Sequence, residues 1–337
     1  MRAAIYGAGS MGTILGAYIT KSGGQIDLIN HNVPHVEALR KNGAHITGTV
    51  DFVQPVRAFT PEEMNGTYNI IILLTKQMHN EEIVRWLIPY LTPDGVIVTL
   101  QNGIPELKIS EIVGADHVLG CTAAWGATML EPGVCELTSS PDSLTFQLGS
   151  PSPFPNRHIH DVEQLLGMMG PVVIEDNFIG TRWTKLLINA SFSGLSTALG
   201  CTFGGVIKPR DTRAILQLLF KECIDVARKG NIRFEPVQGK DVILFLDYNG
   251  PIKKFLTFSI LPIAMRKHIR LKASMLQDLE KGKKCEVDAL NGLVCSYGRE
   301  VDCPTPMNDT VVEVIHRIEA GELKPCRDNL KYFTQKI

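Results

Sequence analysis

The apolar positions of the chain follow two different periods, one in each half of the sequence. In the first half, short apolar runs alternate with stretches whose apolar positions recur every three or four residues. Beyond Gly180 only the helical period continues. This change predicts an α/β fold, in which an N-terminal Rossmann-type domain with a parallel sheet, residues 1–179, is followed by an all-α C-terminal domain, residues 180–337.

The individual elements of the first half follow from these runs. The predicted strands are Arg2–Tyr6, Gln25–Ile29, Asn69–Leu74, Val96–Leu100, Val118–Thr122 and Val172–Glu175. One predicted helix begins at Ser10, and three more span Glu81–Leu91, Ile104–Ile112 and Asp161–Met169. A turn is predicted at Thr92–Gly95, directly after the helix Glu81–Leu91. Val134–Thr138 and Leu144–Leu148 are predicted to pair as a hairpin.

The second half is predicted to be almost entirely helical. The expected helices are Thr181–Leu199, Asp211–Lys229, Arg266–Glu280, Glu286–Tyr297 and Met307–Ala320. In the first of them, Lys185, Asn189 and Ser193 are four residues apart and would share one stripe of the helix surface. A stripe of this kind is either a functional surface or an ordinary solvated face.

A glycine motif follows the first predicted strand directly. Residues 7–12, GAGSMG, match the pattern G-x-G-x-x-G between a strand and a helix. Gly7 permits the tight turn, Gly9 lets a pyrophosphate approach the backbone, and Gly12 allows the helix to pack closely on the strand. The free N–H groups at the helix start favour phosphate. We therefore expect Gly7, Gly9, Ser10, Met11 and Gly12 to bind a dinucleotide cofactor.

The end of the second predicted strand is where such folds meet the adenosine ribose. A carboxylate usually occupies this place, but the chain has Asn30 and His31. Asn30 can hydrogen-bond a ribose hydroxyl, and His31, together with Arg40 or Lys41, could accommodate a 2′-phosphate. Arg40 and Lys41 are equally compatible with a solvated helix face, so these residues leave NAD and NADP open.

Two further polar residues follow strands of the predicted sheet. Lys76 comes after the strand Asn69–Leu74, and Asn102 comes after Val96–Leu100. Ligands of open parallel sheets bind along the carboxyl ends of the strands, so both residues are candidate ligands of the cofactor.

Composition and charge limit the classes of function. The formal net charge is −1 over 337 residues, so no overall field favours nucleic acid or an anionic membrane. No apolar run reaches the roughly 18 residues of a membrane helix, and the first strand leaves no room for a signal peptide. The eight cysteines show no paired spacing, and His158 and His160 lack further ligands, so we expect reduced thiols, a cytoplasmic location and no metal site.

Several motifs together resemble the ketopantoate reductase family (2-dehydropantoate 2-reductases) from Met1 to about Glu319. The matching segments are GAGSMG at 7–12, TK at 75–76, QNG at 101–103, KLLIN at 185–189, SMLQD at 274–278 and EVDALNG at 286–292. The resemblance implies an NADP-dependent enzyme, with NAD as the alternative, that reduces ketopantoate to D-pantoate in pantothenate biosynthesis.

The resemblance also implies roles for individual residues. Lys185 would be the general acid, and Glu286 would orient or assist it and lie at the cofactor. Asn189, Ser193, Ser274 and Asn102 would contact the substrate. Lys76 and Asn102 would contact the cofactor.

Some positions depart from the pantoate-forming members of the family. Ser193 and Phe203 match two asparagines that line the substrate pocket there, and His31 replaces the arginine that binds the 2′-phosphate. The segments INHNVPHVEALRKNG and CTAAWGATMLEPGV are more similar to a branch that forms D-2-hydroxy acids from other 2-oxo acids, in part with NAD.

Three functions therefore stay open. The first is ketopantoate reduction, the second is a D-2-hydroxy-acid or opine-type dehydrogenase, and the third is a redox sensor that binds NAD(P) without turnover. The expected partner is a small 2-oxo acid, with neither nucleic acid nor membrane. We expect a homodimer, although no residue pattern determines the oligomeric state.

Overall fold

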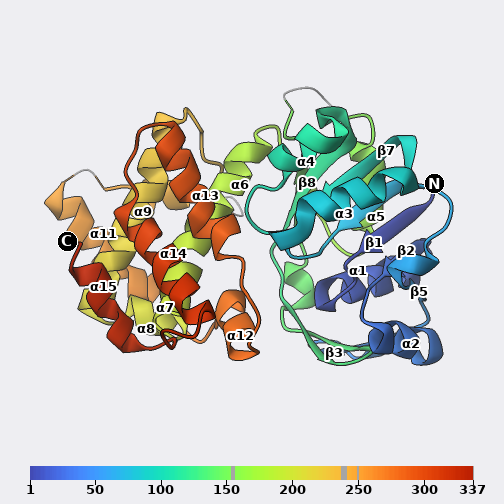
Figure 1. The fold of residues 1–337 in the computed structure, drawn as a ribbon, viewed down its shortest axis with the longest axis horizontal. Coiled ribbons are helices and arrows are strands. Elements are labelled where there is room, and N and C mark those ends of the chain that lie inside the picture. Colours follow the sequence, from blue (N-terminus) through green and yellow to red (C-terminus); the bar gives the residue numbers. More distant parts are fainter. Residues whose placement is uncertain (153–155, 237–240, 249, 337) are drawn as a thin grey trace. The chain divides into compact units, whose positions relative to one another are not determined.

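The computed structural model describes residues 1–152, 156–236, 241–248 and 250–336 and divides the chain into two compact units (Figure 1). Unit 1 comprises Met1–Gln101 and Pro105–Phe178, and unit 2 comprises Asn102–Ile104 and Ile179–Ile337. Strands occur in unit 1, whereas the described part of unit 2 is built from helices and the segments that join them. The predicted fold class, a Rossmann-type sheet followed by a helical region, is confirmed.

Eight strands of unit 1 form the main sheet. They are β1 (Ala3–Tyr6), β2 (Ile26–Ile29), β5 (Arg57–Phe59), β6 (Tyr68–Leu73), β7 (Leu91–Thr99), β8 (Val118–Ala123), β11 (Phe146–Gly149) and β12 (Val172–Ile174). Their order is β12-β11-β8-β7-β6-β1-β2-β5, and the six strands from β8 to β5 are parallel. These six have the strand order of a Rossmann fold, which reverses direction between β1 and β6.

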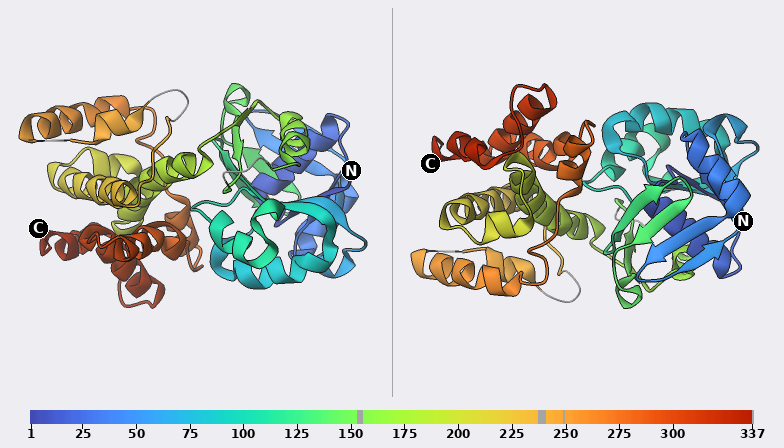
Figure 2. Two further views of the ribbon diagram at one scale, coloured as in Figure 1. Left: turned by 90° about the horizontal axis from the view of Figure 1, so that it is seen from above. Right: turned by 90° about the horizontal axis from the view of Figure 1, so that it is seen from below.

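Helices cover both faces of this sheet, which explains why its strands are continuously apolar. The helices are α1 (Ser10–Lys21), α2 (Val33–Asn42), α3 (Asn80–Leu87), α4 (Glu106–Val113) and α5 (Ile159–Gly167). Ile70 and Ile72 of β6 belong to the core shared with α1 and α5, while Ile71 and Leu73 belong to the core shared with α3 and α4. Figure 2 shows α3 and α4, in cyan, together on one side of unit 1.

A second sheet covers α1 from the other side. It contains β3 (Ala44–Gly48), β4 (Phe52–Gln54), β9 (Ala127–Glu131) and β10 (Val134–Leu137), in the order β4-β3-β10-β9. Helix α1 contacts β3, β4, β9 and β10 as well as β1 and β2, so it is buried on nearly every face. This sheet, visible in the right panel of Figure 2, is absent from the sequence prediction.

Two predictions in unit 1 are wrong. Val134–Thr138 and Leu144–Leu148 do not form a hairpin, because β10 pairs with β9 and β3 whereas β11 pairs with β8 and β12. The turn predicted at Thr92–Gly95 lies within β7. There the pairing with β6 shifts register, which leaves Pro93 and Gly95 outside the regular ladder.

The helices of unit 2 pack around one hydrophobic core that includes the buried Trp183. They are α6 (Phe178–Ile188), α7 (Leu195–Ala198), α8 (Phe203–Ile207), α9 (Arg210–Lys229), α10 (Val242–Leu246), α11 (Pro251–Ala264), α12 (Ser274–Glu280), α13 (Val287–Glu300), α14 (Pro306–Glu319) and α15 (Leu330–Thr334). No helix among the described residues is both long and apolar enough to cross a membrane.

Two of these elements differ from the prediction. The helix expected at Thr181–Leu199 is interrupted by a π-helical turn at Asn189–Gly194, which separates α6 from α7. The helix expected at Arg266–Glu280 begins only at Ser274, because the preceding residues form turns and extended chain. The helical period of these apolar residues does not distinguish a helix from consecutive turns.

A buried carboxylate joins α9 to α14. Glu222 accepts hydrogen bonds from the backbone N–H of Met307 (2.7 Å) and Asn308 (3.0 Å) and from Nδ2 of Asn308 (2.7 Å). These are donors at the first turn of α14, where backbone N–H groups lack helical partners. Burial raises the pKa of Glu222 to about 7, against the opposing effect of these hydrogen bonds. The carboxylate thus caps a helix at the expense of its own desolvation.

This carboxylate predicts a pH-dependent stability. Folding raises the pKa of Glu222 from 4.5 to about 7, so the folded state binds the proton more tightly than the unfolded state. The resulting contribution of Glu222 to the free energy of unfolding is complete below pH 4.5 and is lost as the pH rises through 7. The unfolding free energy of the wild type minus that of Glu222→Gln should therefore fall by about 3 kcal/mol across this window. Urea unfolding between pH 4.5 and 8 measures the difference. The exposed Glu313→Gln is the control, and a flat curve for Glu222→Gln would contradict the prediction.

Candidate active site

The glycine motif forms the turn between β1 and α1, where the strand order reverses. Gly7 has a φ of +90°, which disfavours any residue with a side chain. A Cβ at Gly7 would lie 2.6 Å from the backbone nitrogen of Thr75, which follows β6. The loops after β1 and β6 therefore touch at the switch point of the sheet, where ligands of this fold bind.

The other two glycines of the motif differ in their surroundings. A Cβ at Gly12 would lie 2.9 Å from Cγ2 of Ile5, so this glycine lets α1 pack on β1. At Gly9 the nearest atom to a Cβ would be the carbonyl oxygen of Gly7 at 4.0 Å, so the space above this residue is open. Helix α1 starts at Ser10, and its N-cap residue Gly9 has no side chain to satisfy the first N–H groups. This combination of open space and free donors fits a pyrophosphate.

Polar contacts hold the glycine loop in place. The backbone N–H groups of Gly7 and Ala8 both donate to the carbonyl of Ile29. Asn30, 8% exposed, donates from Nδ2 to the carbonyl of Ala8 at 2.7 Å. Ser10 donates from Oγ to the carbonyl of Ala127 at 3.4 Å. Asn30 was predicted as a ribose ligand, and the structure adds a second role, in which its amide closes the loop.

His35 extends this network to the second sheet. The backbone N–H of Gly133 donates to Nδ1 of His35 at 3.0 Å, so the proton of the neutral ring is on Nε2. Nε2 lies 3.0 Å from Oγ1 of Thr13, which in turn donates to the carbonyl of Ala8. Burial lowers the pKa of His35 and favours this neutral form. His35 and Thr13 carry no motif signal, and the sequence analysis missed both.

His31 and Arg40, the residues considered for binding a 2′-phosphate, have different surroundings. His31 is exposed just after Asn30 at the end of β2. Arg40 donates from Nε to the carbonyl of Ala58 at 2.7 Å and forms an ion pair with Glu63. Arg40 thus ties α2 to β5 and the turn that follows, in agreement with its interpretation as an ordinary helix-face residue.

The loops after β6 and β7 are joined by one glutamine. Gln101, 4% exposed, donates from Nε2 to the carbonyl of Thr75 at 2.6 Å and to Oδ1 of Asn80 at 2.7 Å. Its Oε1 accepts a hydrogen bond from Nδ2 of Asn80 at 3.0 Å. Gln101 therefore fixes the backbone that carries the exposed Lys76. The sequence places Gln101 in the QNG segment but carries no signal for this role.

The remaining candidates belong to unit 2. Asn102 is in the short segment Asn102–Ile104 of this unit. Lys185 lies in the last turn of α6, and Asn189 and Ser193 lie in the π-helical turn. Helices α12 and α13 both contact this turn; Ser274 is the first residue of α12, and Glu286 is the N-cap of α13. The fold thus brings the elements that carry Ser274 and Glu286 to the π-helical turn that contains Asn189 and Ser193 and follows Lys185.

Phe203 contacts the same turn. Its ring stacks on that of Phe192 with a centroid distance of 5.5 Å and an interplanar angle of 26°. Phe192 is 3% exposed and also packs edge-on against Phe220. Phe203 therefore adds apolar surface beside the π-helical turn.

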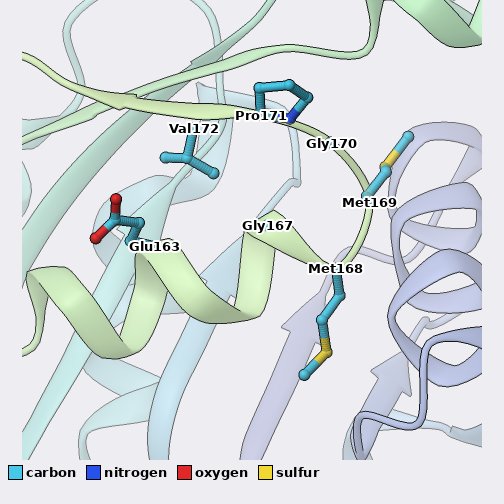
Figure 3. A pocket seen from close by; sticks show the side chains of 7 residues that line it. All are labelled: Glu163, Gly167, Met168, Met169, Gly170, Pro171 and Val172. Carbon is cyan, nitrogen blue, oxygen red and sulfur yellow. The ribbon is translucent and has the colours of Figure 1, made fainter.

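A separate hollow of about 460 Å³ lies on unit 1 between α5 and β12 (Figure 3). It contains none of the predicted site residues; its lining is Glu163, Gly167, Met168, Met169, Gly170, Pro171 and Val172. His158 and His160 pair with Asp161 and Glu163. The described residues contain no group of three or more His, Cys, Asp or Glu suited to a metal ion.

The open space at Gly9 generates a prediction. The φ of Gly9 is −77°, outside the left-handed region, and a Cβ there would meet no atom closer than 4.0 Å, so we expect Gly9→Asp to fold. Its carboxylate would occupy the pyrophosphate position, so dinucleotide affinity should fall at least about 100-fold. Fluorescence titration with NADPH and NADH measures the affinity. Gly167→Asp, also with open space around its Cβ, is the control. Unchanged affinity in Gly9→Asp would contradict this site.

Comparisons with known proteins cover nearly the whole chain. The family model "Ketopantoate reductase PanE/ApbA" matches residues 3–151, and "Ketopantoate reductase PanE/ApbA C terminal" matches residues 177–319. The 2-dehydropantoate 2-reductase of Mesorhizobium japonicum is 26% identical over 94% of this chain and 98% of its own. That of Pyrococcus abyssi is 28% identical over 96% of this chain and 100% of its own.

Solved structures share the fold. A D-mandelate dehydrogenase with NADH and anilino(oxo)acetate has a TM-score of 0.80 at 23% identity and covers 95% of this chain and 99% of its own. A PanE/ApbA family ketopantoate reductase from Ralstonia eutropha has a TM-score of 0.80 at 21% identity and covers 96% and 99%. Because the two family models match both halves of the sequence, the chain belongs to the ketopantoate reductase family, as its motifs predict.

Proposed function

We propose that the protein reduces ketopantoate (2-dehydropantoate) to D-pantoate with NADPH. Membership of the family makes it an NAD(P)-dependent oxidoreductase that acts on a CH–OH group. The observation that carries the proposal is that the family match includes both the glycine loop and the segments with Lys185 and Glu286. The Rossmann strand order and the open space at Gly9 support the cofactor part of the proposal.

Lys185 would act as the general acid. A bound nicotinamide would supply the hydride for the ketone carbon, and the protein would have to stabilise the negative charge that develops on the ketone oxygen. An ammonium group beside that oxygen stabilises the charge and donates the proton. Desolvation would lower the pKa of the lysine towards neutrality, and the Glu286 carboxylate would oppose that change and orient the amine. The glutamate would also contact the cofactor.

The substrate would be held by neutral donors. Asn189, Ser193 and Ser274 lie in or beside the π-helical turn, and each offers a hydrogen-bond donor to the carboxylate or hydroxyl of a 2-oxo acid. Asn102 would contact both substrate and cofactor. We propose that these residues determine the substrate specificity, whereas unit 1 binds the dinucleotide.

The phosphorylated cofactor is the finer part of the proposal. Lys76 at the end of β6 and the exposed His31 at the end of β2 are the groups we assign to phosphate recognition. A charged histidine favours a 2′-phosphate, and a neutral one can hydrogen-bond a ribose hydroxyl. NAD is the alternative that these residues permit.

A second substrate class is supported by one observation. Phe203 stacks on Phe192 where pantoate-forming relatives have an asparagine, which favours an apolar 2-oxo acid. The solved structure of the similar D-mandelate dehydrogenase contains NADH and anilino(oxo)acetate. The alternative function is therefore an NAD-dependent D-2-hydroxy-acid dehydrogenase.

Two further properties are part of the proposal. Helix α11 exposes Phe255, Leu256, Ile260 and Ile263, and this apolar face supports a homodimer. A monomer in light scattering would contradict that assembly. All eight cysteines are free thiols, which supports the expected reducing, cytoplasmic location.

The first test is a panel of 2-oxo acids with both nicotinamide cofactors. We expect NADPH consumption with ketopantoate, at a kcat/KM at least about tenfold above that with NADH or with an aromatic 2-oxo acid. Absorbance of the reduced nicotinamide measures it. Higher efficiency with NADH and an aromatic acid would favour the alternative dehydrogenase. Binding of the cofactor without consumption for any acid would indicate a redox sensor.

The second test concerns the proton donor. Lys185→Ala should lower kcat by roughly 10²–10⁴-fold, with cofactor affinity nearly unchanged. Glu286→Ala should also lose activity, and the double variant should lose far less than the product of the two single effects, because the two residues act as a unit. Lys221→Ala, at a half-buried lysine of α9, is the control. Turnover near the wild-type level in Lys185→Ala would show that the mechanism is wrong.

A further inference from the structure

The helix that carries the catalytic and substrate candidates has an unusual turn. Helix α6 runs to Ile188 and α7 starts at Leu195, and the chain between them, Asn189–Gly194, is π-helical. A π-helical turn is wider than an α-helical one, is rare, and is frequently found at functional sites. It changes the direction in which later side chains leave the helix, so Ser193 is not one α-turn above Asn189.

One buried asparagine of α13 lies directly against this turn. Asn291 is fully buried and donates from Nδ2 to the carbonyl of Ala190 at 2.9 Å. A Cβ at Gly194 would lie 2.5 Å from Oδ1 of Asn291 and 2.8 Å from Nδ2. The amide of Asn291 therefore occupies the space beside Gly194, and only a glycine leaves room for it. The first and last parts of the turn are thus held by the same side chain.

The orientation of this amide is fixed from behind. Nδ2 of Asn291 also donates to Oδ1 of Asn308 at 2.9 Å. Nδ2 of Asn308 donates to Oε2 of Glu222 at 2.7 Å. Both oxygens of Glu222 accept hydrogen bonds from backbone N–H groups of α14, so Asn308 presents Nδ2 to Glu222 and Oδ1 to Asn291. Asn291 then presents its N–H group to Asn308 and to Ala190. Oδ1 of Asn291 has no hydrogen-bond partner among the described residues, so this orientation does not satisfy all the polar atoms of the amide.

We propose that Asn291 is a positioning residue for the substrate, because the chain Glu222–Asn308–Asn291 holds the π-helical turn in the geometry that presents Asn189 and Ser193. The inference rests on the proposed function for the identity of the substrate. It adds a residue that does not touch the substrate and that acts through the backbone of Ala190 and the space at Gly194.

The test replaces the donor with an apolar side chain of similar size. In Asn291→Leu, the KM for ketopantoate should rise at least about tenfold, the size expected for a lost buried hydrogen bond, while the KM for NADPH stays within about twofold. Amide hydrogen exchange of residues 189–195, measured by mass spectrometry, should accelerate at least about tenfold, while exchange in α9 stays unchanged.

A second variant keeps the test decisive if the first is poorly folded. Gly194→Ala adds only a methyl group, and alanine is a better helix former than glycine. Its Cβ would displace the Asn291 amide, so it should cause the same two changes.

Asn329→Leu is the matched control. Asn329 is 3% exposed and donates from Nδ2 to the carbonyl of Ala198, at the end of α7 rather than in the π-helical turn. This variant should lower the melting temperature and leave the KM for ketopantoate and the exchange of 189–195 unchanged. A purely structural role of Asn291 would give the same pattern as this control.

The outcomes separate the two proposals. Faster exchange with a raised KM supports the positioning role. Unchanged exchange, or faster exchange with an unchanged KM, overturns that role and leaves the proposed function intact. A wild-type protein that reduces no 2-oxo acid overturns the proposed function and the substrate part of this inference, and the exchange measurement then still decides whether Asn291 holds the turn.

Discussion

The close approach of two loops at the reversal of strand order is the constraint on which the cofactor half of the molecule depends. Gly7 lies so near Thr75 that a Cβ would be 2.6 Å from the backbone nitrogen of that residue. This contact requires a glycine with positive φ, and it places the start of α1 beside the end of β6. The N–H groups of α1 and the exposed Lys76 consequently lie along the same edge of the sheet, the edge where Rossmann folds bind their ligands.

The buried polar contacts of both units serve to position backbone rather than to form isolated ion pairs. In unit 1, Asn30 and Thr13 both donate to the carbonyl of Ala8, and Gln101 donates to that of Thr75. In unit 2, Asn291 donates to the carbonyl of Ala190. The carbonyls of Ala8 and Thr75 lie in loops, and that of Ala190 lies in the π-helical turn. A buried side chain donates to each of these carbonyls and favours one conformation, since an unpaired buried carbonyl is costly.

Some of the site could be predicted from the sequence because its signal is local. The pattern at residues 7–12 between a strand and a helix predicts the loop that the structure contains, since the three glycines stand at fixed places between β1 and α1. The roles of Lys185 and Glu286 came from the family resemblance and stay predictions. The positioning roles of His35 and Gln101 could not be predicted from local patterns. His35 contacts Gly133, which is distant in sequence, and Gln101 contacts Asn80, which the packing of a separate loop brings to it.

The sequence by itself determined the fold class, the central parallel strands and the cofactor loop, because apolar periodicity and the glycine motif are patterns of a few consecutive residues. Only the tertiary structure decided the second sheet, in which β3 pairs with β10 from almost 90 residues away, and the separation of β10 from β11. The sequence of a short strand does not specify which strand it pairs with. The pairing depends on the element that the sheet packs against, which is helix α1 here. The π-helical turn is likewise contacted by Asn291, about 100 residues beyond it, which donates to the carbonyl of Ala190. A local pattern predicts a regular α-helix there, because it carries no information on contacts with residues that are distant in sequence.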